Sequence, residues 1–108
     1  MGEFFQVQTT FGRREDADRC GATLVERGYA ACAQVLGPLA STYRWRGQVE
    51  TSEEWLCLIK TSRKHYRQVE QAIIELHPYE TPQIIALPIA MGSAAYLAWV
   101  AEQTSSKG

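Results

Sequence analysis

The sequence has almost no excess of charge of either sign and no long hydrophobic run. Eleven Lys and Arg residues stand against twelve Asp and Glu residues, which gives a net charge of −1 over 108 residues. A protein that holds nucleic acid needs a basic face, so this balance argues against a nucleic-acid partner. No run approaches the roughly 20 apolar residues of a membrane span. The first residues also lack a basic region followed by an apolar stretch, so we expect no signal peptide and a cytoplasmic location.

Cysteine and histidine are scarce as well. The three cysteines, Cys20, Cys32 and Cys57, form no C-x-x-C pair and stand in apolar stretches, so we expect them to be reduced and buried. Of the two histidines, His65 stands beside basic residues and is expected to be solvated, which leaves His77. The sequence has no glycine-rich phosphate loop, metal-ligand cluster or Ser/His/Asp spacing. We therefore predict that the protein is not an enzyme and requires no cofactor.

Length and composition indicate one soluble globular domain over residues 1–108, with a polar tail at 104–108 that we expect to be frayed. Alternating or wholly apolar runs predict strands, and apolar residues three and four apart predict helices. The expected strands are 4–10, 30–36, the two arms of a long hairpin over 41–61 with its tip at 47–52, and 83–89. The expected helices are 14–27, 62–76 and a third that opens at 92–93. Gly37-Pro38 is expected to end the second strand.

Each expected helix carries an apolar stripe. In the first helix the stripe is Ala17, Cys20, Gly21 and Leu24, and in the second it is Tyr66, Val69, Ile73 and Leu76. In the third it is Tyr96, Leu97, Val100 and Ala101. Trp99 points away from that last stripe, so we expect it at a contact surface.

The order of elements is βαββαβ followed by a terminal helix. This order predicts an α+β, ferredoxin-like fold, in which an antiparallel sheet has its helices on one face. The other sheet face would then be bare. In the strand 54–61, however, Trp55, Cys57 and Ile59 alternate with Leu56 and Leu58, so both faces are apolar. We therefore predict that the bare face packs on other copies of the chain in a closed homo-oligomer.

The segment 75–82, Glu-Leu-His-Pro-Tyr-Glu-Thr-Pro, lies between the second helix and the last strand. Its two prolines stiffen the backbone and hold the residues before them in extended geometry. Between the prolines it carries aromatic and ionisable groups, where a plain connector would carry Gly, Asn, Asp and Ser. One interpretation is that the segment is held against a ligand, a metal or another subunit. The other is a rigid loop whose Tyr79 ring covers a local core.

Five residues are candidates for an inter-subunit pocket or interface. Lys60 ends an apolar strand, where a lone charge needs a partner. Tyr79 and Glu80 stand in the proline segment, and Arg44 and Trp45 stand in the hairpin. One interpretation is a cleft between subunits that takes a small anion or a metal–ligand complex. The other is an interchain salt bridge from Lys60 or Arg44 to Glu80.

Several motifs, spread over nearly the whole chain in one order, resemble the CutA family, the divalent-cation tolerance proteins. They are ACA at 31–33, STYRWRG at 41–47, the strand 53–61, LHPYETP at 76–82, IIALPI at 84–89 and YLAW at 96–99. The resemblance implies a ferredoxin-like homotrimer, similar in build to the PII signalling proteins, whose long hairpin joins the sheet of a neighbouring subunit. It also implies a non-catalytic tolerance or response protein with weak binding of copper or another divalent metal. The alternative is a PII-like signalling or scaffold module that binds a small ligand or a partner protein between subunits.

The resemblance carries over one metal ligand, His77. In family members described as copper binders, the proposed ligands are a Cys at the end of the first strand and adjacent histidines before the Pro-Tyr pair. Here the first strand ends Gln8-Thr9-Thr10, and Leu76 precedes His77. Copper(II) prefers several nitrogen or oxygen donors, so a single imidazole predicts a weak site. The alternative is that His77 forms hydrogen bonds within its own loop.

Overall fold

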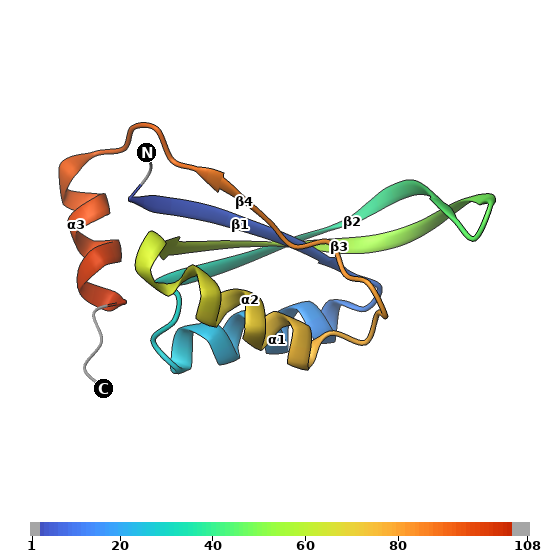
Figure 1. Cartoon of the computed structure of the whole chain (residues 1–108), viewed down its shortest axis with the longest axis horizontal. Helices are drawn as coiled ribbons and strands as arrows, with labels where there is room; N and C mark the ends of the chain where they lie inside the picture. Colours follow the sequence, from blue (N-terminus) through green and yellow to red (C-terminus); the bar gives the residue numbers. More distant parts are fainter. Residues whose placement is uncertain (1–2, 105–108) are drawn as a thin grey trace.

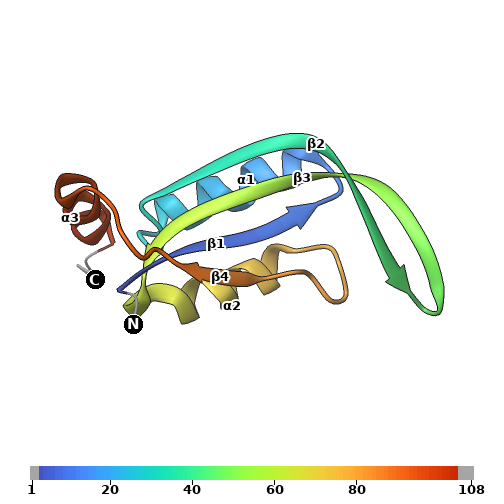
Figure 2. The same cartoon turned by 90° about the horizontal axis from the view of Figure 1, so that it is seen from above.

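The fold is a four-stranded antiparallel sheet with two helices on one face and a third at one end (Figures 1 and 2). The computed structural model describes residues 3–104. Its elements are β1 (Phe4–Phe11), α1 (Arg14–Glu26), β2 (Cys32–Trp45), β3 (Gln48–Ser62), η1 (Arg63–His65), α2 (Tyr66–Leu76), β4 (Ile85–Pro88) and α3 (Ala94–Gln103). The strand order is β2-β3-β1-β4, and each neighbouring pair is antiparallel. The predicted α+β, ferredoxin-like architecture is confirmed.

Helices α1 and α2 cover one sheet face, α1 with the whole stripe that the sequence predicted and α2 with part of it, since Tyr66 and Leu76 are only half-buried. In α1, Ala17, Cys20, Gly21 and Leu24 are buried. In α2, Val69, Ala72 and Ile73 are buried. These side chains pack on the inward side of the central strands, where Val7, Phe11, Cys57 and Ile59 are also buried. Because all of them except Gly21 belong to one contiguous apolar cluster, α1, α2 and the sheet share a single core.

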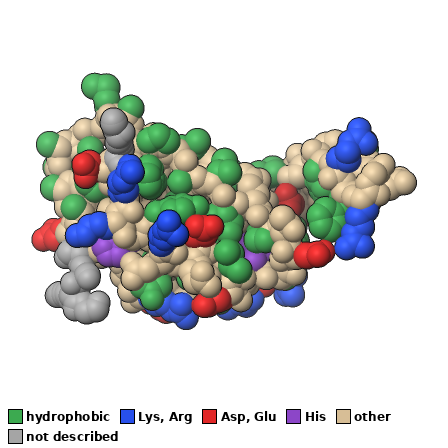
Figure 3. Space-filling model, in the orientation of Figure 1, with side chains coloured by type: hydrophobic (Ala, Val, Ile, Leu, Met, Phe, Trp, Pro, Cys, Tyr) green, Lys and Arg blue, Asp and Glu red, His purple; other side chains and the backbone are tan. Residues whose placement is uncertain are grey.

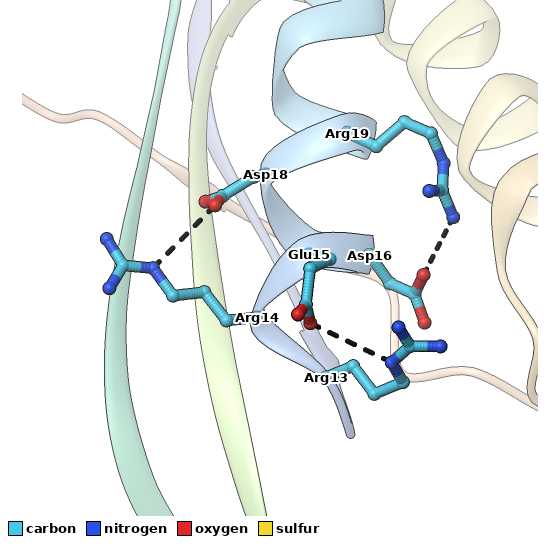
Figure 4. Close-up of polar contacts among 6 residues, drawn as sticks. All are labelled: Arg13, Arg14, Glu15, Asp16, Asp18 and Arg19. Atoms are coloured by element: carbon cyan, nitrogen blue, oxygen red, sulfur yellow. Dashed lines mark hydrogen bonds and ion pairs between the residues drawn. The ribbon is translucent and has the colours of Figure 1, made fainter.

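The solvent side of α1 is polar at its start. There Arg13 pairs with Glu15, Arg14 with Asp18, and Arg19 with Asp16, at 3.7, 3.7 and 2.7 Å (Figure 4). Glu15 and Asp16 also lie in the first turn, where acidic groups favour the helix dipole. Exposed ion pairs of this kind contribute at most about 1 kcal/mol each, so α1 is held mainly by its apolar stripe.

The hairpin formed by β2 and β3 is longer than predicted. The sequence predicted a break at Gly37-Pro38 and a tip at 47–52, and both predictions are wrong. Strand β2 continues through Gly37-Pro38, because a register shift between Leu36 and Leu39 takes up the irregular residues while pairing to β3 resumes beyond them. The tip is a two-residue turn, Arg46-Gly47, between the paired residues Trp45 and Gln48. Both turn residues have positive φ (52° and 80°), which suits the tight turns of two-residue hairpins.

The sheet face opposite α1 and α2 carries apolar side chains, as the alternation in β3 predicted. The strand registers place Leu56 and Leu58 on this face together with Leu36 of β2 and Ile85 and Leu87 of β4. Leu36, Ile85 and Leu87 are 44–48% exposed. We call these five residues the open-face cluster.

Helix α3 lies at the end of the sheet, away from α1 and α2 (Figure 1). Its N-cap is Ser93, whose Oγ accepts a hydrogen bond from the Tyr96 N–H at 3.2 Å. Val100 is buried, whereas Tyr96 and Trp99 are each 39% exposed and pack on one another. Trp99 is therefore as exposed as expected, but Tyr96, from the expected stripe, is equally exposed. None of the helices in residues 3–104 combines the length and the apolar character needed to cross a membrane.

Two predictions are wrong at the end of the sheet opposite the hairpin. His65, expected to be solvated, is buried, and its Nδ1 lies 2.8 Å from Ser62 Oγ. Thr104, expected in a frayed tail, is buried and donates a hydrogen bond to the Val100 carbonyl at 2.8 Å. The remaining tail, 105–108, lies outside the described residues. Glu3, His65 and Thr104 line one hollow of about 490 Å³, so the two ends of the described chain lie together.

Two of the three cysteines are buried as expected, and one is not. Cys20 and Cys57 lie in the core, where burial raises the pKa of Cys20 to about 11 and that of Cys57 to about 12. Cys32 is half-buried, with its Sγ 3.4 Å from the Tyr96 hydroxyl, so its prediction as a buried side chain is wrong. All three are free thiols.

Candidate functional site

A hollow lies between the far half of the hairpin and the segment that follows α2. It has a volume of about 630 Å³, within the range of small-molecule pockets. We call it the hairpin hollow. Among its lining residues, the aromatic ones are Tyr43, Trp45 and Tyr79, and the charged ones are Arg44, Glu54 and Glu80. In Figure 3 the hairpin projects from the body of the molecule.

Four of the five predicted pocket residues come together in the hairpin hollow. Arg44, Trp45, Tyr79 and Glu80 all line it. Lys60 does not, because it lies in the other half of β3, paired in register with Gln6 and Cys32. There its ammonium group donates a hydrogen bond to Gln34 Oε1 at 3.1 Å, which gives the lone charge the polar partner it needs.

His77 is tied to its own chain through both ring nitrogens. Its Nδ1 accepts a hydrogen bond from the Tyr79 N–H at 3.2 Å, so the ring proton is on Nε2, which donates to the Thr10 carbonyl at 2.8 Å. The ring also stacks on Phe11, with centroids 4.1 Å apart. His77 is 8% exposed, and this burial lowers its pKa, against the raising effects of the Thr10 carbonyl and of Glu54. The folded chain therefore holds a neutral imidazole whose two nitrogens already have partners.

This geometry does not fit a metal site at His77 as it stands. A metal ion would need the lone pair of one ring nitrogen, so His77 would first have to give up its bond to Thr10 or to Tyr79. Within residues 3–104, no three His, Cys, Asp or Glu side chains are grouped so that they could hold a metal ion. The interpretation of His77 as a loop-bonding residue fits these contacts, and its role as a metal ligand stays a prediction.

Tyr79 reaches across the end of β1 to Glu54 on β3. Its hydroxyl donates to Glu54 Oε2 at 2.6 Å, and the Glu54 side chain is buried. Burial first, and then the hydrogen bond and charge of Glu54, raise the pKa of Tyr79, so this phenol stays protonated and acts as a donor. The close approach requires a small residue beside the ring, since a Cβ on Gly12 would lie 3.2 Å from the Tyr79 hydroxyl.

Glu80 is paired within the chain, with a residue that was not among the predicted pocket residues. Arg46 at the hairpin turn lies 3.3 Å from Glu80 Oε1, and its guanidinium is also 5.2 Å from the centre of the Trp45 ring. The pair joins the hairpin tip to the segment after α2. Both side chains are about 70% exposed, so the contact positions the tip and adds little stability.

Sequence reasoning missed Glu54 and Arg46. The alternation in β3 places Glu54 on the same face as Leu56 and Leu58, which was a usable signal for an acidic group on an apolar face. Its contact with Tyr79, 25 residues away, depends on how the segment after α2 returns across the sheet. Arg46 belonged to the motif at 41–47 but was given no role.

The comparisons with known proteins agree on one family. Residues 5–103 match the family model described as CutA1 divalent ion tolerance protein. The divalent-cation tolerance protein CutA of Thermus thermophilus is 40% identical over 98 residues, which make up 91% of this chain and 95% of that protein. Protein CutA of Mus musculus is 34% identical over 90 residues, covering 83% of this chain and 51% of the mouse protein, so this chain spans about half of it.

Solved structures extend the likeness to the backbone. The crystal structure of the stable protein CutA1 from the psychrotrophic bacterium Shewanella sp. SIB1 superposes with a TM-score of 0.94 at 35% identity, covering 97% of this chain and 98% of that one. The match spans the hairpin, the segment after α2 and α3, where the sequence motifs lie. This chain therefore belongs to the CutA1 divalent ion tolerance family.

Proposed function

We propose that this divalent-cation tolerance protein works without catalysing a reaction, as a homotrimer in the cytoplasm. One observation supports the non-catalytic part: His77 and Tyr79, the acid–base groups near the hairpin hollow, already have hydrogen-bond partners. His77 uses both nitrogens in fixed bonds, and the Tyr79 hydroxyl is committed to Glu54. A general base needs a free lone pair within reach of its substrate, and neither ring nitrogen of His77 offers one at rest.

The open-face cluster supports the assembly. Five Leu and Ile side chains share the sheet face that α1 and α2 leave uncovered, and three of them are 44–48% exposed. Burying such a face against identical copies is the usual way to remove it from water, at roughly 25 cal/mol per Å² of apolar surface. The three free thiols support a reducing compartment.

Weak binding of copper(II) or another divalent ion is the finer part of the proposal. Calorimetric titration of the wild type and of His77→Ala with copper(II) tests it, with circular dichroism as a check that the variant is folded. If the heat of copper(II) binding disappears in His77→Ala, His77 is a ligand, and it must break one of its two hydrogen bonds to bind the ion. Equal heat from both proteins, or none, removes His77 from the metal chemistry.

A signalling or scaffold module of the PII type is the second candidate. The hairpin hollow favours it, because a volume of about 630 Å³ with aromatic and charged lining suits a small ligand. The two candidates predict different partners, a metal ion in the first and an organic molecule in the second.

A further inference from the structure

Glu54 is a buried carboxylate without a basic partner. Its side chain is 6% exposed, and it lines the hairpin hollow. Within the described residues 3–104, no ion pair joins it to Lys, Arg or His. Its hydrogen-bond partner is the Tyr79 hydroxyl, which donates to Oε2 and neutralises no charge. Burying a carboxylate in this way is costly unless a cation compensates it, so a positive charge placed in the hollow would be favoured.

The walls of the hairpin hollow suit a cation of a particular kind. Tyr43, Trp45 and Tyr79 line it and keep 41%, 40% and 39% of their surfaces exposed. The faces of aromatic rings attract cations, and quaternary ammonium groups are recognised in this way because their alkyl groups also make apolar contacts. The Trp45 ring already has the Arg46 guanidinium 5.2 Å from its centre, so a ring of this wall accepts a cation in the folded chain. Tyr43 is held in place by the contact of its hydroxyl with Ser52 Oγ at 3.1 Å.

We propose that the hairpin hollow binds a small organic ammonium ion, with its charged head against Glu54 and its alkyl groups against the three aromatic rings. A bare metal ion fits less well, because it would find one carboxylate and one phenol in place of a grouped set of ligands. An inorganic anion fits less well, because two of the three charged lining residues are carboxylates and the third, Arg44, is exposed. The inference goes beyond the proposed tolerance function, deepens the second candidate by naming the class of its small ligand, and uses residues of one chain.

Choline and its uncharged carbon isostere, 3,3-dimethylbutan-1-ol, test the proposal on the full chain. We expect choline chloride to bind saturably in calorimetry and the alcohol to bind at least about tenfold more weakly, because the shape is shared and the charge is not. Potassium chloride at equal ionic strength controls for salt. Equal binding of choline and the alcohol, or no binding of choline, would overturn the proposal.

Matched variants test whether choline binding depends on the charge of Glu54 and on the aromatic rings. Glu54→Gln keeps an acceptor for the Tyr79 hydroxyl but removes the charge, and we expect at least about a tenfold loss of choline affinity. Glu53→Gln, an exposed neighbour on the opposite face of β3, should bind choline as the wild type does. If Glu54→Gln does not fold, Trp45→Leu in the exposed hairpin removes one aromatic wall and should weaken choline binding as well. Unchanged affinity in the folded Glu54→Gln variant, or in Trp45→Leu, would refute the site.

Sedimentation run on the same samples separates this inference from the proposed assembly. A monomer that binds choline refutes the trimer and supports the ammonium site. A trimer that does not bind choline supports the proposed assembly and refutes the ammonium site.

Discussion

The two ring nitrogens of His77 give this residue a pH-dependent effect on stability. Burial lowers the pKa of His77, and burial together with Lys64 lowers the pKa of His65. The unfolded chain, in which histidine titrates near its ordinary pKa of about 6.5, therefore binds protons at a higher pH than the folded chain does. The stabilising contribution is complete above that pH and is lost as the pH falls through it toward the lower folded-state pKa. Protonation of His77 would also remove the acceptor that holds the Tyr79 N–H.

We expect the free energy of unfolding to fall between pH 7.5 and pH 5, and to fall less in His77→Gln. Urea unfolding followed by circular dichroism at a series of pH values measures both slopes. Glutamine keeps a donor toward Thr10 and does not titrate, so the difference between the two slopes isolates the imidazole. Parallel slopes would show that folding does not lower the pKa of His77.

Thr9 and Thr61 are two buried threonines with opposite hydrogen-bonding states. Both are 0% exposed. Thr61 Oγ1 donates to the Tyr29 carbonyl at 2.6 Å, whereas Thr9 Oγ1 has no hydrogen-bond partner among the described residues. An unsatisfied buried hydroxyl costs about 1–3 kcal/mol, and a satisfied one contributes about 1 kcal/mol.

Substitution by valine should therefore change stability in opposite directions at the two sites. Thr9→Val is expected to raise the free energy of unfolding by about 1 kcal/mol, and Thr61→Val to lower it by about as much. Chemical denaturation of both variants beside the wild type measures the two changes. Destabilisation by Thr9→Val would mean that the hydroxyl has a buried water as its partner.

At the scale of elements, α1 packs on β2 at a glycine. A Cβ on Gly21 would lie 2.9 Å from the Ala33 Cβ, a contact that neither residue can relieve by rotating a side chain. Alanine normally stabilises a helix interior by about 1 kcal/mol relative to glycine, while overpacking costs about 1–3 kcal/mol. The second effect is larger here.

Gly21→Ala is thus expected to destabilise the protein by about 1 kcal/mol, against the usual trend for helices. Ala22→Gly, at the next and exposed position of α1, is the control, and should cost about 1 kcal/mol through helix propensity alone. Thermal and urea unfolding of the two variants give the comparison. A stabilised Gly21→Ala would show that α1 can move away from β2 at little cost.

Elements with a regular period were the predictable part of this fold. The stripe of α1 was predicted residue by residue, because a spacing of three and four is a property of the sequence itself. The hairpin was mispredicted because Gly37-Pro38 was treated as a strand end, whereas two long paired strands tolerate a register shift there. Within the candidate site, Arg44, Trp45, Tyr79 and Glu80 were predicted from the sequence. The Tyr79–Glu54 and Arg46–Glu80 contacts were not predicted, because they depend on how the segment after α2 folds back over the sheet.

At the scale of the whole molecule, the open-face cluster predicts how copies associate. Leu58 lies near the middle of this face, between Gln8 of β1 and Gln34 of β2. A charge there would have to be buried in any assembly that covers the face, at a cost of several kcal/mol. Association should therefore fail before folding does.

We expect the wild type to sediment as a trimer at micromolar concentration and Leu58→Asp to sediment as a monomer with a native circular dichroism spectrum. Val25→Asp, which places the same charge at a 40% exposed position on α1, should remain trimeric. Wild-type monomers, or a trimeric Leu58→Asp variant, would show that the sheet face is not the association surface.

Glu3 and Thr104 border a common hollow. The start of β1 and helix α3 lie at the end of the molecule opposite the turn between β2 and β3 (Figure 1). A biosensor tether attached beyond either residue would thus present the molecule in one orientation, with the hairpin toward the analyte. Immobilisation through the amino or the carboxyl side should give interchangeable sensorgrams.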